Sequence, residues 1–230
     1  MLYVVQAGAG RRGALIYQLA DEYTRSLFGL IADRDDAAVT ATERLRERLG
    51  EWVTGAPVVA RSLVELRRPL ISDVQLRTAE ITAPDERDVE VAVRETMAHG
   101  DLHGLNVLVN QLNEPALIDY GEVRRANAAL DPVTLELSIV YHPTMAGRLD
   151  GWPTEAQAAS WHDLDAYCDG CPVDAFVRAC RAWAQDVSAG EQEVLATAYA
   201  YSIRQVKYGG HAIPLALAVA DGAHAALAGT

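Results

Sequence analysis

The sequence predicts an α+β protein that is mostly helical, with one small β-hairpin near its centre and another at its start. Two short, apolar, β-prone runs, Val107–Val109 and Ala116–Ile118, are separated by turn-forming residues and predict the central hairpin. Leu2–Gln6 and Ala14–Leu19 predict two further paired strands. After Ser26 apolar residues recur at helical spacing, so helices are expected to make up most of the rest.

Composition narrows the classes of function. The chain has 230 residues, half of them hydrophobic, and a formal net charge of −12, which is enough for one domain with a sizeable core. The acidic balance argues against nucleic acid or an anionic membrane as the main partner, since both need a basic face. The most apolar stretch, Ile213–Ala220, is too short to span a bilayer, and no signal-peptide pattern precedes the first strand. We therefore expect a soluble, cytoplasmic protein.

A glycine-rich turn joins the first two strands. Gly8, Gly10 and Gly13 have the spacing of a dinucleotide-binding fingerprint. In that fingerprint a helix follows the glycines and its N-terminus binds the phosphates, whereas here a strand follows. A simple hairpin turn is therefore expected.

Helical patterns then extend towards the central hairpin. Ser26 is expected to cap a short helix, and Thr40–Val53 has apolar residues at helical spacing. Residues 55–84 carry weaker signals, and within them Asp73–Ile81 fits a strand or a helix. Asp85–Met97 is predicted as a helix, because acidic residues in its first turn favour the helix dipole.

The second half of the chain is predicted to be helical. Asp131 is expected to cap an apolar helix that continues to Tyr141, with Glu136 inside it as a structural carboxylate. Thr154 is expected to cap the next helix, and three more are expected over Pro172–Val187, Glu191–Tyr208 and Ile213–Leu227. Five residues of the middle helix form a pocket wall or belong to the core, and we favour the core: Tyr199, Tyr201, Arg204, Gln205 and Tyr208.

The three cysteines are Cys168, Cys171 and Cys180, an odd number that favours reduced thiols over disulfides. Cys168 and Cys171 form a CxxC pair, and with His162 nearby one interpretation is a zinc site. The other is a turn followed by a helix in which Cys180 is packed. We favour the turn, because a second ligand pair is missing.

Three oxygen-bearing side chains surround the central hairpin. Asn106 comes just before its first strand and Asp119 just after its second, so the two are expected side by side, with Asp101 on the loop leading in. Mg²⁺ prefers oxygen ligands and keeps waters and substrate phosphates in its shell, so one amide and one carboxylate suffice to bind it. A separate carboxylate can orient or deprotonate an attacking hydroxyl.

These motifs resemble the protein-kinase-like phosphotransferases, most closely the aminoglycoside phosphotransferase and choline kinase branch. The resemblance rests on His99-Gly-Asp101, on Asn106, and on Ile-Asp119-Tyr-Gly. It implies that Asp101 is the catalytic aspartate and that Asn106 and Asp119 are metal ligands. Mg²⁺ and ATP are the implied cofactors. The short segment after Gly121 favours a hydroxyl-bearing small-molecule acceptor over a protein.

The same resemblance implies a division of the chain. Residues 1–20 resemble the last strands of a small N-terminal lobe, 21–25 a hinge, and 26–230 the helical C-terminal lobe. Asp21 and Glu22 in the hinge would then meet the adenine of ATP. The family anchors ATP phosphates with a small-lobe lysine, but Lys207 is the only lysine here. A missing N-terminal lobe or a partner domain is therefore expected.

Two questions stay open at this point: the role of His103 in the loop, and whether the chain is catalytically active. His99 resembles the histidine that braces the family's catalytic loop, while His103 either binds a phosphate or braces the loop. The whole chain is either an active phosphotransferase or a pseudokinase that serves as a scaffold in bacterial signalling, the second because the lysine is missing. A further resemblance, to bacterial ternary-complex-associated kinase-like domains, rests on the segments LIYQLAD, DLHGLNVLV and IRQVKY.

Overall fold

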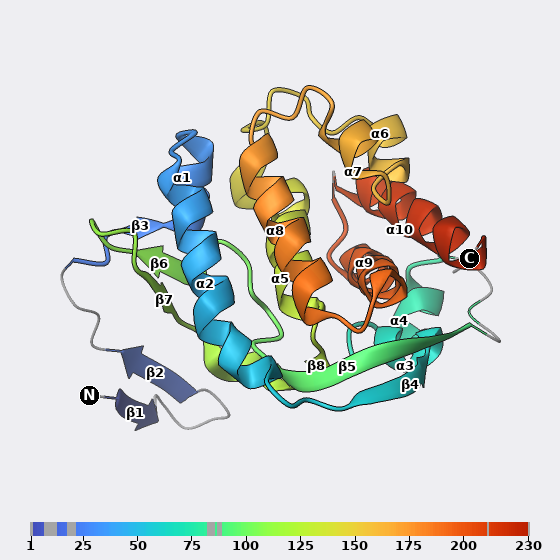
Figure 1. Ribbon diagram of the computed structural model, residues 1–230, viewed down its shortest axis with the longest axis horizontal. Coiled ribbons are helices and arrows are strands. Elements are labelled where there is room, and N and C mark those ends of the chain that lie inside the picture. The colour runs from blue at the N-terminus through green and yellow to red at the C-terminus, as the bar shows by residue number, and fades with distance from the viewer. Residues whose placement is uncertain are drawn as a thin grey trace.

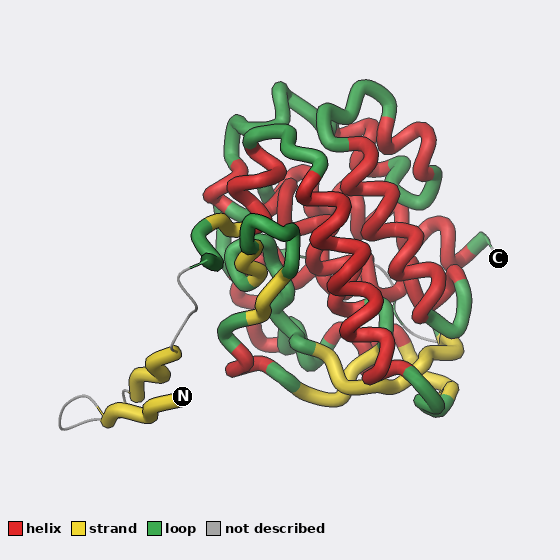
Figure 2. Tube along the Cα trace, turned by 60° about the vertical axis from the view of Figure 1, so that its left-hand side comes forward, coloured by secondary structure: helices red, strands yellow, loops and turns green. Residues whose placement is uncertain are grey.

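The computed structural model describes residues 2–6, 13–17, 22–81, 86, 89–210 and 212–229. It has an α+β fold with two small three-stranded antiparallel sheets, ordered β3-β6-β7 and β4-β5-β8, and a separate two-stranded sheet, β1-β2 (Figure 2). The strands are β1 (Leu2–Gln6), β2 (Gly13–Tyr17), β3 (Arg25–Ser26), β4 (Val58–Ser62), β5 (Glu90–Ala98), β6 (Val107–Val109), β7 (Pro115–Leu117) and β8 (Arg124–Asn127). The helices are α1 (Leu27–Ala32), α2 (Ala37–Val53), α3 (Leu63–Arg67), α4 (Asp73–Thr78), α5 (Leu130–Tyr141), α6 (Glu155–Ala159), α7 (Leu164–Cys168), α8 (Asp174–Val187), α9 (Glu191–Arg204) and α10 (Ile213–Ala228), with short 3₁₀ turns η1 (Tyr120–Glu122), η2 (Pro143–Met145) and η3 (Gln205–Lys207).

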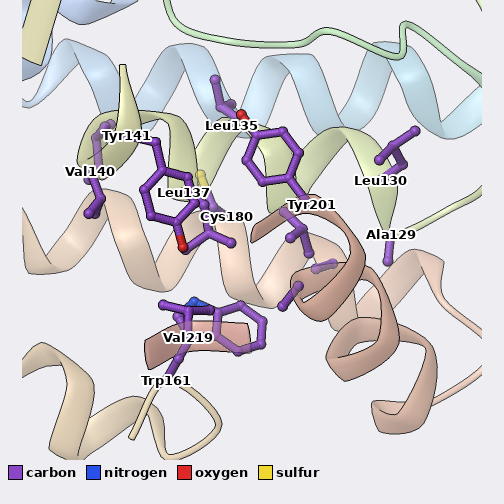
Figure 3. Close-up of a cluster of buried hydrophobic side chains, with 14 of the residues drawn as sticks. Ala129, Leu130, Leu135, Leu137, Val140, Tyr141, Trp161, Cys180, Tyr201 and Val219 are labelled. Carbon is purple, nitrogen blue, oxygen red and sulfur yellow. The ribbon is translucent and has the colours of Figure 1, made fainter. Parts of the chain in front are cut away.

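Helix α5 lies at the centre of the helical layer. It contacts α8 on one side and α9 on the other, and α9 in turn packs on α10. The β4-β5-β8 sheet runs beneath the lower ends of these helices (Figure 1). Every residue of α5 is buried, and its apolar side chains meet those of α8, α9 and α10 in the cluster of Figure 3. Because α5 is enclosed by the rest of the fold, its position is fixed, and it can hold the loops that contact it in place.

A buried ion pair crosses this core. Glu136 of α5 accepts hydrogen bonds from Arg181 of α8 at 2.8 and 3.1 Å and from the Trp161 indole at 2.7 Å. Arg181 also lies over the Trp161 ring at 3.6 Å. The expectation that Glu136 is a structural carboxylate is therefore confirmed.

Both predicted hairpins form. In the central one, β6 pairs with β7 in the antiparallel register Val107↔Leu117, and β3 adds a third strand through Arg25↔Val109. Strands β1 and β2 pair from Leu2↔Tyr17 to Gln6↔Gly13. The turn between β1 and β2 lies outside the described residues, except for Gly13 itself.

The helix predicted over Asp85–Met97 is wrong where the structure describes it. Residues Glu90–Ala98 form β5, the middle strand of its sheet. Val91 and Val93 are buried while Glu90 and Ala92 are exposed, so the period is two and not 3.6. β-Branched residues at alternate positions suit a strand with one buried face.

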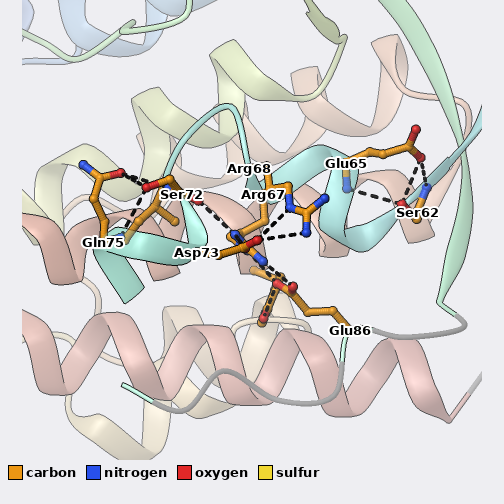
Figure 4. Close-up of polar contacts among 10 residues, drawn as sticks. Ser62, Glu65, Arg67, Arg68, Ser72, Asp73, Gln75 and Glu86 are labelled. Carbon is orange, nitrogen blue, oxygen red and sulfur yellow. Dashed lines mark hydrogen bonds and ion pairs between the residues drawn. The ribbon is translucent and has the colours of Figure 1, made fainter. Parts of the chain in front are cut away.

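Residues 55–81, which carry weak sequence signals, contain one strand and two short helices. Ser62 and Ser72 each form a capping box, with Glu65 and Gln75 respectively, and these boxes begin α3 and α4 (Figure 4). The segment Asp73–Thr78 is therefore helix. Buried Arg67 links the two helices to Glu86 and Asp73 through hydrogen bonds of 2.6–2.9 Å (Figure 4).

The C-terminal helices follow the prediction with shifted ends. Thr154 caps α6 through a capping box, as expected. Helix α8 begins at Asp174 rather than Pro172, and α9 ends at Arg204 before a 3₁₀ turn. The cap of α5 is Ala129, so the prediction that Asp131 caps this helix is wrong.

No helix in the described ranges combines the length and the apolar character that crossing a membrane requires.

The buried ion pair of the core can be tested on α8. Arg181→Met leaves Glu136 buried without its cation, and we expect the free energy of unfolding to fall by about 3–5 kcal/mol. Arg178→Met, on the same helix, removes only half-exposed ion pairs to Asp165 and Asp174, and we expect a loss below about 1 kcal/mol. Urea unfolding of both variants measures the difference, and equal losses would contradict this account of the core.

Candidate functional site

The loop after β5 is fixed by a buried carboxylate of α5. Asp131 accepts hydrogen bonds from the backbone N–H groups of His99 at 2.7 Å and Gly100 at 3.0 Å. Burial raises the pKa of Asp131, while the two N–H donors oppose this rise. Gly100 has φ +81°, and a Cβ there would lie 2.4 Å from the carbonyl oxygen of Glu122, so only glycine fits at this bend.

His99 braces the loop against the hairpin. Its ring is fully buried, and Nε2 lies 2.9 Å from the carbonyl oxygen of Ile118. Since a carbonyl oxygen only accepts hydrogen bonds, Nε2 carries the proton. This contact agrees with the bracing role implied for His99.

Asn106 joins the loop to the hairpin. Its side-chain NH₂ group donates to the backbone carbonyl of Asp101 at 2.9 Å. Its backbone carbonyl accepts from the N–H of Ile118 at 3.0 Å. The side chain is almost buried, with 6% of the residue exposed. Because the NH₂ group is used by the loop, the oxygen of the amide is the atom available to a ligand.

Asp119 follows Ile118 and is exposed. Its backbone is left-handed, with φ 60° and ψ 62°, a conformation uncommon for residues other than glycine and frequent at functional positions. The hairpin register sets Asn106 opposite Ile118, so Asp119 lies one residue beyond the residue that bonds to Asn106. The predicted proximity of Asn106 and Asp119 thus has its basis in the hairpin.

Asp101 lies at the edge of a cavity of about 460 Å³ between the loop and the end of α9. Its Oδ1 accepts from Arg204 Nη2 at 3.0 Å, and its Oδ2 is 3.7 Å from His103 Nε2. Tyr201, Arg204, Gln205 and Tyr208 line the cavity. Arg204, Gln205 and Tyr208 therefore match the pocket-wall interpretation. The favoured core interpretation is correct for Tyr199, which donates to Glu86, and Tyr201 both lines the cavity and belongs to the buried core.

His103 and His142 form a second wall of this cavity, with ring centroids 5.0 Å apart. Burial lowers the pKa of both histidines, and Asp101 opposes the effect in each case. Nδ1 of His103 accepts the N–H of Leu105 at 3.3 Å, so its contacts are those of a loop brace. Its alternative role in binding a phosphate stays a prediction.

The hinge residues are separate from this cavity. Glu22 is exposed, and its carbonyl oxygen accepts from the N–H of Thr24 at 3.1 Å. Asp21 lies outside the described residues. Their contact with adenine stays a prediction.

In the part of the chain that the structure describes, no three His, Cys, Asp or Glu side chains are grouped to hold a metal ion. At the CxxC pair, the N–H of Cys171 bonds to the carbonyl of Cys168 at 2.9 Å in a turn, His162 is exposed, and Cys180 is buried within α8. These contacts match the turn interpretation. A magnesium site at Asn106 and Asp119 would need oxygen atoms from a bound phosphate.

The sequence interpretation missed two residues of the site. Asp131 was taken as a helix cap, and His142 was given no role. The signal at Asp131 was the Asp131-Pro132 pair at the start of an apolar helix, which was interpreted as a cap alone. His142 carried none, because its contacts to His103 and Phe28 come from distant parts of the chain.

The anchor of the loop can be tested at Asp131. Asp131→Asn sets an NH₂ group against one of two backbone donors, and we expect a loss of about 1–3 kcal/mol in the free energy of unfolding because a buried N–H loses its acceptor. Asp221→Asn, at an exposed position of α10, is the matched control and should change the free energy of unfolding by less than about 0.5 kcal/mol. Chemical denaturation compares the two. An Asp131→Asn protein as stable as the control would contradict the anchoring role.

The paired histidines predict a pH dependence. Their folded pKa values lie below the ordinary value of 6.5, so the unfolded chain binds more protons and stability is lost as the pH falls below 6.5. The double variant His103→Asn/His142→Asn retains an acceptor for the N–H groups of Leu105 and Thr144, and should lose less stability than the wild type between about pH 7.5 and pH 5. Urea titrations at both pH values test this, and an unchanged pH dependence would refute it.

No family model matches this sequence, and no curated protein matches it either. What the chain does is therefore inferred from the side chains of this site and from the motifs that carry them.

Proposed function

We propose that the chain is a phosphotransferase of the protein-kinase-like type that transfers the γ-phosphate of ATP to a hydroxyl of a small molecule, in the cytoplasm where ATP is supplied. The observation that carries the proposal is the central hairpin, which brings Asn106 and Asp119 to one end and fixes the loop of Asp101 beside them. Asp101 also borders a cavity of about 460 Å³, the size of a small-molecule site.

Asn106 and Asp119 are the residues that would hold Mg²⁺. The oxygen of the Asn106 amide is left available by the contacts of its NH₂ group, and the Asp119 carboxylate is exposed. Both are oxygen donors of the kind that magnesium takes together with phosphate and water. When bound, the ion neutralises the charge of the ATP phosphates.

Asp101 would orient the acceptor hydroxyl and accept its proton. Arg204 holds Oδ1, and this contact leaves Oδ2 facing His103 at 3.7 Å. Asp131 of α5 holds the backbone of the loop, and Arg204 of α9 holds the side chain of Asp101. The Asp101 carboxylate is therefore fixed by contacts from two helices. Catalysis that works by positioning the reacting groups requires such a preorganised carboxylate.

The second candidate function is a scaffold that binds a partner without catalysis. It is favoured by Lys207, the only lysine of the chain, whose Nζ donates to the carbonyl of Leu70 at 3.3 Å and lies over the Tyr208 ring at 4.8 Å. This ammonium group thus contacts Tyr208 and the segment between α3 and α4, and its contacts are not with the hairpin that would hold the phosphates.

Calorimetric titration with Mg–ATP and a transfer assay separate the two candidates. We expect Asp119→Ala to weaken Mg–ATP binding at least about tenfold, as loss of a charged contact does. Asp101→Asn should retain this binding and lower the rate of transfer by about 10²–10⁴-fold. Asp165→Ala, at an exposed position on α7, is the control for both measurements.

The absence of Mg–ATP binding to the wild type would exclude the phosphotransferase and leave the scaffold. Binding that Asp119→Ala does not weaken would exclude the proposed metal site. Transfer that Asp101→Asn does not slow would exclude the role of Asp101.

A further inference from the structure

The turn that holds the CxxC pair brings its two cysteines within reach of each other. The N–H of Cys171 bonds to the carbonyl of Cys168 at 2.9 Å. Asp169 has φ −58° and ψ 119°, and Gly170 has φ +67°, which are the values of a type II turn with glycine at its third position. Such a turn sets the Cα atoms of its first and last residues within about 7 Å of each other. A disulfide can form over this distance without movement of the backbone.

The two thiols differ in accessibility and in acidity. Cys168 is buried, with 6% of the residue exposed, whereas Cys171 is half-buried and lines a cavity of about 320 Å³. A hydrogen bond from the Cys168 thiol lowers the pKa of Cys171 against the effect of burial, and the N–H of Val173 at the start of α8 lowers it further. The same contact between the thiols raises the pKa of Cys168. Because the thiolate is the attacking form, Cys171 is the nucleophile of the pair.

The cavity beside this pair has an excess of negative charge. It lies between the first turn of α8 and the junction of α1 with α2, which are neighbours in Figure 1. Its described lining residues carry three carboxylates, Asp35, Asp36 and Asp174, and one guanidinium, that of Arg34. Asp35, Asp174 and Arg34 are paired with charges outside the lining, whereas Asp36 is exposed and has no ion pair within the described ranges. A positively charged compound is therefore favoured there over a negatively charged one.

We propose that Cys168 and Cys171 are a redox-active dithiol that exchanges with small disulfides, with Cys171 as the attacking sulfur and Cys168 as the resolving one, and that the cavity prefers a positively charged disulfide to a negatively charged one. Both thiols are free in the structure. The cavity shares no lining residue with the cavity of Asp101, so this proposal does not rest on the phosphotransferase.

The exchange takes two steps. The thiolate of Cys171 attacks one sulfur of the small disulfide, forms a mixed disulfide with it and releases the other half as a thiolate. That thiolate takes the proton of Cys168, whose sulfur then attacks the sulfur of Cys171 and expels the second half as a thiolate. The protein gives up two electrons and forms one S–S bond, and the small disulfide is reduced to a thiol and a thiolate.

The test uses two small disulfides of opposite charge. Cystamine carries two ammonium groups, and 3,3′-dithiodipropionate carries two carboxylates. After reaction the protein is quenched with acid, unfolded and alkylated, and its mass is measured. Of the three cysteines, we expect cystamine to leave only Cys180, which is buried in α8, open to alkylation. Dithiothreitol should restore alkylation at all three.

The rates report the preference of the cavity. Each rate is divided by the rate of the same disulfide with 2-mercaptoethanol, which corrects for intrinsic reactivity. The corrected rate should be at least about threefold higher for cystamine at low ionic strength, as expected for one exposed charge. This ratio should fall as salt is added, because salt screens exposed charges.

Variants assign the roles. Cys171→Ser should slow oxidation at least about tenfold, because the remaining Cys168 is buried. Cys168→Ser should react with cystamine and stop at the mixed disulfide, which the wild type should not accumulate. Asp36→Asn should remove most of the preference for cystamine, whereas Glu51→Gln, at an exposed position near the other end of α2, should retain it. Thermal unfolding verifies that each variant is folded, and Cys171→Ala replaces Cys171→Ser if that variant is not.

The proposal is overturned if cystamine leaves all three cysteines open to alkylation, or if the wild type stops at the mixed disulfide. It is also overturned if Cys168→Ser forms no mixed disulfide, or if the cysteine left in Cys171→Ser reacts as fast as the wild type. Equal corrected rates for the two disulfides would overturn the preference of the cavity. Oxidation of a protein that does not bind Mg–ATP would uphold the dithiol and reject the phosphotransferase alone.

Discussion

The site depends on one buried carboxylate, Asp131, that accepts two backbone N–H groups from the loop after β5. Those two bonds connect α5, every residue of which is buried, to the loop that carries Asp101. Gly100 allows the loop to bend there, and His99 connects it to the β6–β7 hairpin through Ile118. The packing of α5 is thereby transmitted to the position of Asp101, although neither Asp131 nor His99 lines the cavity.

Two helices thus hold Asp101 in different ways. Helix α5 fixes its backbone through the loop, and α9 fixes its side chain through Arg204. The relative position of α5 and α9 is set by the apolar cluster between them (Figure 3). A change in core packing would therefore move the carboxylate relative to its arginine, which explains how residues far from the cavity can affect the site.

The structure could be predicted from the sequence where the residues that determine it are close together in the chain. Asn106, Asp119 and the hairpin lie within a short stretch, so their spacing predicted their proximity. The strand β5 was missed because acidic residues near its start suggested a helix, although Val91 and Val93 already alternate. The capping boxes of Ser62 and Ser72 are local signals as well, but they were not recognised in the sequence. The contact between Arg204 and Asp101 was not, because 103 residues separate them and only the packed fold brings them together.

The pairing of Asp101 with Arg204 also bears on the chemistry proposed for the site. Nη2 of Arg204 donates to Oδ1 of Asp101 and to the Tyr208 hydroxyl, so the end of α9 sets the orientation of the carboxylate. Oδ2 is the carboxylate oxygen that Arg204 leaves free, and it is the atom that would meet an acceptor hydroxyl. Loss of Arg204 would therefore lower the turnover rate, because the proposed base would lose the contact that orients it.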